Sequence, residues 1–522
     1  MIETILTSAL IGPSILFLTL RLFSNNHKNT QAVKKTSQLF AAINSLIAIS
    51  GLIYVLNFHS LTFDIGNVNG LGFSFSLNPL TALIYAMVSI IAFVVLRYSY
   101  NYLDGDKNQV KFIQLISITI AFVQFFILSN NLLITFLAWV ATSFSLQKLL
   151  IFYPDRKKAQ IAAKKKFIVA RLGDAFLFVA LALVYYTFQT GDLSTIFVKI
   201  ETLTTPASAA LEWAAVLLVL AAAMKSAQLP THGWLVEVME APTPVSALLH
   251  AGLLNAGPFL IIRFSHLFDF THYGSILLLI IGAGTALFGA LVFTRQPNIK
   301  GHLAYSSVAH MGFSLMVSGM GVYTAGLLHL MAHSFYKAHA FLSSGSIVDK
   351  VRTKNALQFQ RQGSFLKIAG GVLLSVALFL GMAYFWKINA QTPIQILIIS
   401  GIIFSAIMSL IIPAIDSNNN GWSILKTLGF AALVIQAFFF LEEGFRHLIA
   451  SEIPPITAPN AATLYISTSI LAIYFSTIVI HNILSLKFIQ SSAFGVHIKN
   501  GFYLNIWFDK LTNAIQIKSA KQ

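Results

Sequence analysis

The chain has 522 residues, of which 56% are hydrophobic and only 10% are charged, and this balance excludes an ordinary soluble domain. The formal net charge is +16, but the basic residues gather in short loops between apolar runs, which indicates a lipid partner and no nucleic acid. The absence of cysteine excludes disulfides and iron–sulfur ligation by this chain. We therefore expect an all-α polytopic membrane protein without a cofactor of its own.

Apolar runs long enough to span a bilayer recur along the whole chain, and they predict about 15 transmembrane helices (13 to 16). The expected helices cover residues 3–23, 37–57, 79–99, 110–128, 131–152, 167–187, 209–229, 243–265, 274–294, 301–320, 324–348, 366–386, 394–413, 424–441 and 462–485. We interpret them as a single transmembrane domain over residues 1–522, in which 489–522 form a short cytoplasmic tail. The small-residue run 282–290 is interpreted as a close helix contact and not as a phosphate loop.

Lysine and arginine are concentrated in alternate loops of this arrangement. The basic loops carry Lys28, Lys34 and Lys35, then Arg156, Lys157, Lys158, Lys164, Lys165 and Lys166, then Arg295 and Lys300, and finally Lys350, Arg352, Lys354, Arg361 and Lys367. The opposite loops hold few basic residues, Lys199 and Arg446, together with Asp64, Glu442, Glu443 and Glu452. The positive-inside rule then predicts a cell (inner) membrane protein with its N-terminus outside and its C-terminus in the cytoplasm.

The stretch 225–257 interrupts the helical pattern in the middle of the chain. Pro230, Pro242 and Pro244, together with Gly233, leave backbone groups unpaired at membrane depth, which is tolerated only where they are buried in protein or line water. Broken helices of this kind occur at the working sites of transporters built from inverted repeats. We predict a functional site here, and a similar helix end at Lys387 suggests an inverted repeat.

Lys225 ends an otherwise apolar helix and has two interpretations. Its long side chain can extend to the membrane interface, which requires no function. Alternatively, a lysine deprived of water alternates between neutral and charged forms, as a proton relay requires.

Arg171 and Asp174 lie three residues apart and therefore share one helix face, where they can form an ion pair. The pair is either structural, or a gate in which the carboxylate moves between Arg171 and another cation such as Lys225.

His329, His333 and Lys337 recur every four residues and form one stripe along a helix. A row of histidines suits stepwise proton transfer, whereas a single buried histidine is usually structural, and metal binding lacks an acidic or sulfur ligand in that helix. His250 can extend the stripe, as can His302 and His310.

Three segments together resemble the proton-translocating antiporter-like subunits shared by respiratory complex I and the multisubunit cation/proton antiporters. They are KSAQLPTHGWLVEVMEAPTPVSALLHAG, RQPNIKGHLAYSSVAHMGF and HLMAHSFYKAHAFLSSGSI, and the resemblance extends over residues 75–350. It implies an antiporter-like fold with broken helices. It also implies a central proton path through the matching positions, which are Lys225, Asp174, His250, His329, His333 and Lys337.

The chain departs from the complex I subunits in two respects. They carry a glutamate after the tryptophan of the fifth span, whereas Val140 follows Trp139 here, and they continue into a long lateral helix for which too few residues follow 486. The segments FYPDRKKAQIAAKKKFIVARLGD and VHIKNGFYLN are similar to those of the DabB branch, the membrane subunits of DAB inorganic-carbon accumulation complexes. This resemblance implies a large peripheral partner of the DabA type, with a zinc site related to carbonic anhydrase.

We therefore expect a cation-conducting subunit, for protons or sodium ions, that drives CO2 hydration to bicarbonate by the zinc-containing partner. Lys225 is the expected switch, Asp174 with Arg171 the modulating pair, and His250, His329, His333 and Lys337 the relay, with Lys387 as an exit group. Glu237 and Glu240 fall in a cytoplasmic connection, at the mouth of the path or on the docking surface of the partner. Two alternatives stay open, a proton-pumping subunit of a quinone reductase or cation/proton antiporter, and a non-conducting membrane anchor.

Overall fold

The structure is a computed structural model that describes residues 2–24, 29–344, 364–388, 391–417, 421–483, 493–506, 508 and 510. The first half of the chain forms α1 (Ile2–Thr19), η1 (Leu20–Leu22), α2 (Thr30–Asn57), β1 (Leu61–Val68), β2 (Leu71–Leu77), α3 (Pro79–Tyr102), α4 (Gln109–Leu128), α5 (Leu132–Leu150), α6 (Lys157–Phe188), α7 (Leu193–Glu201) and α8 (Ala209–Lys225). The central stretch forms α9 (Gly233–Glu237), η3 (Val238–Glu240), α10 (Thr243–Leu248), η4 (Leu249–Leu253), α11 (Ala256–Arg263) and α12 (Ser265–Phe270). The remainder forms α13 (Tyr273–Phe293), α14 (Ile299–Gly319), α15 (Tyr323–Leu342), α17 (Phe365–Phe385), α18 (Ile394–Asp416), α19 (Gly421–Leu448), α20 (Ala461–Ile483), α22 (Ala493–Lys499) and η5 (Gly501–Tyr503).

The predicted all-α membrane architecture is confirmed, since each of the fifteen predicted ranges falls on a helix or on a pair of joined helices. The count of fifteen spans is not confirmed. Among the described residues, ten helices are long and apolar enough to cross a membrane. The helix α8 has only 17 residues, α14 and α15 carry histidine and serine, and α1 and α20 are apolar over shorter stretches.

A β-hairpin between α2 and α3 is an element that the sequence analysis did not predict. The strands β1 and β2 pair antiparallel, with Leu61 opposite Leu77 and Val68 opposite Leu71. The turn residues Asn69 and Gly70 both have positive φ, +54° and +76°, as a two-residue Asn-Gly turn requires. The signal in the sequence is the alternation of apolar residues around this turn, which differs from the long apolar runs that mark the helices.

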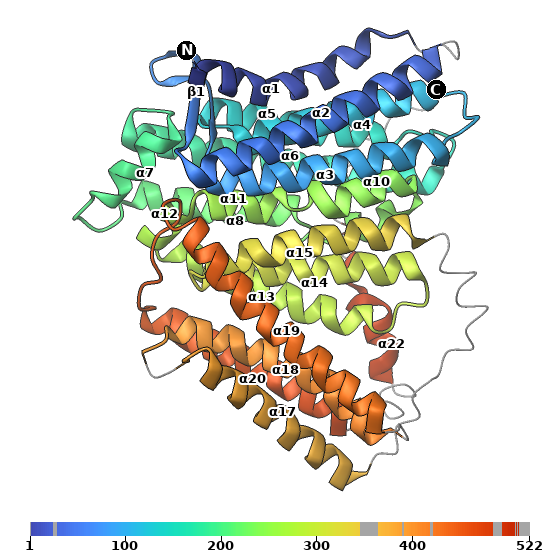
Figure 1. The fold of residues 1–522 in the computed structure, drawn as a ribbon, viewed down its shortest axis with the longest axis vertical. Helices are drawn as coiled ribbons and strands as arrows, with labels where there is room; N and C mark the ends of the chain where they lie inside the picture. The colour runs from blue at the N-terminus through green and yellow to red at the C-terminus, as the bar shows by residue number, and fades with distance from the viewer. Residues whose placement is uncertain are drawn as a thin grey trace.

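The long helices lie side by side in one bundle (Figure 1). The helices α1–α6 occupy one end of its long axis, α8–α15 the middle, and α17–α20 the other end. The hairpin and α7 lie at one set of helix ends, and α22 lies toward the opposite set. The interpretation of 282–290 is confirmed, because a Cβ on Gly282 would lie 2.4 Å from the backbone nitrogen of Met316 and one on Gly289 2.7 Å from that of Ala309.

Two breaks in the middle of the bundle expose helix ends in its interior. The helix α8 stops at Lys225, and the next residues close it with a bond from the Gln228 amide to the Ala223 carbonyl at 3.1 Å. Ala227 has a φ of +54° there, a conformation that usually falls to glycine and that costs a residue with a Cβ about 1 kcal/mol. The chain therefore leaves the helical conformation directly after Lys225.

The second break lies between α10 and α11. The segment η4 is a π-helical turn in which the Leu254 amide bonds to the Leu249 carbonyl at 3.0 Å. Pro258 follows. Because its ring nitrogen carries no hydrogen, it cannot donate the hydrogen bond that a continuous helix makes to the carbonyl four residues earlier. The predicted helix 243–265 is therefore two helices joined by a widened turn, which carries His250.

Candidate functional site

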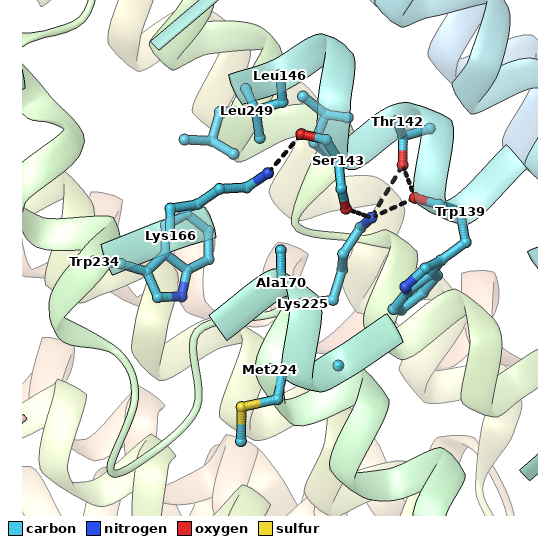
Figure 2. Close-up of a pocket in the computed structure, with 12 residues that line it drawn as sticks. Trp139, Thr142, Ser143, Leu146, Lys166, Ala170, Met224, Lys225, Trp234 and Leu249 are labelled. Carbon is cyan, nitrogen blue, oxygen red and sulfur yellow. Dashed lines mark hydrogen bonds between the residues drawn. The ribbon is translucent and has the colours of Figure 1, made fainter. Parts of the chain in front are cut away.

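Lys225 points into the protein, toward α5. Its ammonium donates three hydrogen bonds, to the Ser143 Oγ at 2.8 Å, to the Thr142 Oγ1 at 3.0 Å and to the Trp139 carbonyl at 3.1 Å (Figure 2). The nitrogen also lies 4.3 Å from the centre of the Trp139 ring, which favours a cation. These contacts oppose the interface interpretation of Lys225, because the amine is held by oxygen atoms of a neighbouring helix.

The predicted pair of Arg171 and Asp174 is present on α6. The guanidinium Nη2 lies 2.7 Å from the Asp174 Oδ2, and the Asp174 residue is 7% exposed. The same guanidinium lies 4.1 Å from the centre of the Phe144 ring. Among the described residues, the hydrogen bonds of Lys225 go to neutral oxygens, so that in this arrangement Asp174 pairs with Arg171 and not with Lys225.

Lys166 is a further buried lysine at this site, and the sequence analysis had assigned it to a loop. Its Nζ donates to the Ser143 carbonyl at 2.8 Å, and it lines the same small cavity as Lys225, Trp234 and Leu249 (Figure 2). The cavity has about 20 Å³ of room, enough for one water. The assignment was wrong because α6 begins at Lys157, ten residues before the predicted start, so the charged turns belong to the helix.

Glu237 lies near the end of the broken stretch and is already paired. Its carboxylate accepts from Lys165 Nζ at 2.6 and 2.7 Å and from Asn505 Nδ2 at 2.7 Å. Asn505 lies in the C-terminal segment 493–506, and this contact joins that segment to the end of the broken stretch. Glu240 lies in η3, and its side chain lies outside the described residues.

His250 projects from the π turn into the interior and is 2% exposed. Its Nδ1 lies 2.9 Å from the Ser307 Oγ of α14, and its ring stacks on Phe341 of α15 with centroids 4.3 Å apart. The widened turn therefore places this histidine between the Lys225 side of the bundle and the next two helices.

The predicted stripe on α15 is present, and His310 of α14 completes it. The His310 Nδ1 lies 3.2 Å from the His329 Nε2, and the rings of His310 and His333 have centroids 5.1 Å apart. Lys337 is fully buried, and its Nζ donates to the Leu303 carbonyl at 3.0 Å. Neither ring nitrogen of His333 has a hydrogen-bond partner within the described part of the chain. Unpaired buried nitrogens of this kind are unusual, because buried polar groups in proteins nearly always have a hydrogen-bond partner.

Two other predicted positions lie apart from this row. His302 is exposed at the start of α14, with its Nδ1 3.0 Å from the Phe293 carbonyl. Lys387 is exposed just beyond α17, and in the described ranges no hydrogen bond or ion pair joins it to the histidines.

A second polar cluster, which was not predicted from the sequence, lies near the hairpin. Arg263 ends α11, is 7% exposed and donates from Nη2 to the Ser76 Oγ at 3.1 Å. Nearby, Asn130 donates to Asp192 at 3.0 Å, and Asn78 donates to Glu452. A single arginine in an apolar run gave the only sequence signal.

Comparison with protein families identifies two matching regions. Residues 129–363 match the family described as "NADH:quinone oxidoreductase/Mrp antiporter, TM", and residues 63–113 match "NADH-Ubiquinone oxidoreductase (complex I), chain 5 N-terminus". The first region contains every residue of the row described above, from Lys225 to Lys337.

Solved structures share the fold. A chain of the Mrp complex from Dietzia sp. matches with a TM-score of 0.64 and 20% identity, over all of this chain and 61% of that one. A chain of the archaeal membrane-bound sulfane sulfur reductase matches with a TM-score of 0.59 and 16% identity, over 98% of this chain and 97% of that one.

Curated relatives are more similar in sequence. The probable inorganic carbon transporter subunit DabB2 of Halothiobacillus neapolitanus is 37% identical over 448 residues, which are 84% of this chain and 80% of the relative. The probable inorganic carbon transporter subunit DabB of Hydrogenovibrio crunogenus is 35% identical over 72% of this chain and 71% of the relative. The chain thus belongs to the DabB family of membrane subunits, a branch of the complex I/Mrp antiporter-like proteins.

Proposed function

We propose that this chain is the cation-conducting subunit of an energy-coupled inorganic carbon transporter. The observation that carries the proposal is the row of buried titratable side chains that runs from Lys225 through His250 to His333 and Lys337. Burial of so many ionisable groups in an apolar bundle is costly, which favours a functional row over a structural one. The relatives' names, which describe inorganic carbon transporter subunits, support inorganic carbon as the transported substrate.

Lys225 is the switch of this proposal. It is charged while the Ser143, Thr142 and Trp139 oxygens hold its ammonium, and a neutral amine loses most of the benefit of three acceptors and a ring face. Asp174 is the modulator, since its carboxylate either stays with Arg171 or moves toward Lys225. Each move changes which cation the carboxylate stabilises.

The histidines and Lys337 form the relay. A histidine ring donates at one nitrogen and accepts at the other, so a proton that arrives at one ring can leave from the far side. His310 and His329 are already within hydrogen-bond distance, and His250 contacts Ser307 on the neighbouring helix. A water beside His333 connects the remaining groups. Lys387 serves as the exit group where a water-filled route connects it to the histidines. Arg263 lies at the hairpin end of the bundle, beside Ser76 of β2.

In this proposal, a partner subunit catalyses the hydration of CO2. A large peripheral subunit of the DabA type, with a zinc site like that of carbonic anhydrase, hydrates CO2 to bicarbonate, and cation flow through this chain drives the step. The basic ends of the helices face the cytoplasm, with the N-terminus outside the inner membrane and the C-terminus inside. Glu237, tied to Lys165 and Asn505, lies at the mouth of the path on that side, and Glu240 is assigned to the same mouth or to the docking surface.

The deciding experiment is the Lys225→Ala variant in cells whose growth depends on carbon uptake. We expect uptake of labelled inorganic carbon to be lost while the complex still assembles, as shown by copurification and identification of the partner. Lys164→Ala is the matched control, since Lys164 is exposed on the same helix as Lys166 and Asp174. If Lys225→Ala supports normal uptake in an assembled complex, the chain is an anchor and does not conduct. If the copurified assembly contains quinone-reducing subunits instead, the alternative respiratory function is correct.

A further inference from the structure

A groove on the outer surface of the bundle is not used by the mechanism above. It has a volume of about 620 Å³ and lies where η1, α4 and α5 converge. Its walls are the apolar side chains Leu115, Ile118 and Phe122 of α4 and Ala141 and Phe144 of α5. Its rim carries Arg21, Lys111 and Lys148, one from each of the three elements.

The groove matches a phospholipid, because its charged end suits the headgroup and its apolar walls suit an acyl chain. The three rim cations are at corresponding ends of their elements, since α1 with η1 and α5 run toward that end while α4 starts from it. All three are exposed, and in the described residues no acidic side chain lines the groove. The start of α4, with the positive end of its helix dipole, lies at this rim as well.

The length of the groove matches one leaflet. Lys111, Leu115, Ile118 and Phe122 recur at helical spacing along one face of α4, and the eleven helical steps from Lys111 to Phe122 rise by about 16 Å. Half of the hydrocarbon core of a bilayer is about 15 Å thick. A headgroup at Lys111 thus places its acyl chain beside Phe122 near the midplane.

We propose that this groove binds an anionic phospholipid from the leaflet on the basic side of the membrane. The phosphate lies among Arg21, Lys111 and Lys148, and one acyl chain lies between α4 and α5. Lysines that merely extend to the membrane interface do not require an apolar groove between them. Three cations around one headgroup attract an anionic lipid more strongly than a neutral one. The proposal commits to the lipid because the charges and the apolar walls occur on the same groove.

The bound lipid also contacts the side of α5 that faces away from Lys225. Phe144 lines the groove, and the same ring lies 4.1 Å from the Arg171 guanidinium. The neighbouring Ser143 holds Lys225. The lipid therefore packs against α5, the helix that carries the three hydrogen-bond acceptors of Lys225.

The test uses the assembled complex in vesicles of phosphatidylethanolamine that contain a minor fraction of phosphatidylglycerol with a photoactivatable group in its acyl chain. After illumination, we expect crosslinks on peptides that cover residues 115–122 and 141–145. The triple variant Arg21→Gln, Lys111→Gln and Lys148→Gln should lower this crosslinking by about tenfold or more, because each cation near the surface attracts anionic lipid. Ala141→Trp, which fills the groove and keeps all three charges, should lower it as well.

The matched control is Lys35→Gln, Lys164→Gln and Lys426→Gln, which removes three exposed cations from other helices and changes the net charge equally. Its crosslinking should equal that of the unmodified chain. The proposal is overturned if the control variant loses as much labelling as the triple variant, or if a phosphatidylcholine probe labels the same peptides equally. It is also overturned if the groove stays unlabelled in the assembled complex, since another subunit then covers it.

Discussion

The Lys225 pocket and the histidine section of the row, which comprises His310, His329, His333 and Lys337, are both buried and both basic, but they hold their charges differently. In the pocket, the ammonium of Lys225 is fixed by three oxygens of α5, and the adjoining α6 carries an acid, Asp174, in an ion pair with Arg171. In the row, Lys337 has a single carbonyl partner, and the described groups nearest to it in the row are histidines. In the proposed mechanism, the pocket holds or releases one charge under the control of Asp174, whereas the row passes a charge along.

This difference separates two kinds of substitution. A group that must change its charge tolerates no residue that is permanently charged or permanently neutral. A group that only passes a proton can be bypassed when a neighbour takes over.

The largest effect is expected for Lys225→Arg. Arginine keeps the positive charge and can reach the same oxygens, but it does not release its proton in proteins. If Lys225 is a switch, labelled carbon uptake should fall by at least about tenfold, nearly as far as in the alanine variant. Assembly of the complex, checked by copurification, should be unchanged. Normal uptake with arginine would show that the position needs only a fixed charge.

The next effect is expected for His250→Gln. His250 is the one histidine that lies on the widened turn between the pocket and the row, so no neighbour replaces it. Glutamine keeps a hydrogen bond to Ser307 but carries no proton, and uptake should fall by about tenfold. His329→Gln is the comparison variant, because His310 and His333 stay close to one another. An equal loss in both variants would contradict the expectation that His310 and His333 can pass the proton without His329.

A smaller effect is expected for Asp174→Asn, because the pocket oxygens still hold Lys225. The change leaves Arg171 without its carboxylate in a largely apolar setting, which is itself unfavourable. We expect a loss of uptake of a few-fold, and the double variant Asp174→Asn with Arg171→Gln should recover part of it. A double-mutant cycle on uptake measures this coupling. Simple additivity of the two losses would show that the pair is not a unit.

The smallest effect is expected for Ser143→Ala. It removes one of the three acceptors of Lys225, the one at 2.8 Å, and a hydrogen bond to a charged group is worth about 1.5–3 kcal/mol at most. Because two acceptors and the Trp139 ring remain, the net loss should be well below that value, and uptake should fall by less than in Asp174→Asn. Ser145→Ala is the matched control, since Ser145 bonds within α5 and lines the outer groove. A loss in the control as large as in Ser143→Ala would place the cause in the helix and not in the pocket.

Much of the fold was predictable from the sequence. The helix ranges followed from the length of the apolar runs, and the break at 225–257 followed from its prolines. The hairpin was missed because its signal is an Asn-Gly turn and not an apolar run. The start of α6 was missed because a helix can continue through charged turns once its remaining length is packed, so that Lys166 entered the interior.

The sequence by itself determined the side chains that share one helix face. The pair of Arg171 and Asp174 and the stripe on α15 are three or four residues apart, and helix geometry alone sets their relation. Only the tertiary structure decided which helices these faces meet. Lys225 finds its oxygens more than eighty residues earlier in the chain, and His310 meets His329 across two helices. The depth and rotation of each helix depend on close packing along its whole length, and local spacing contains no information about them.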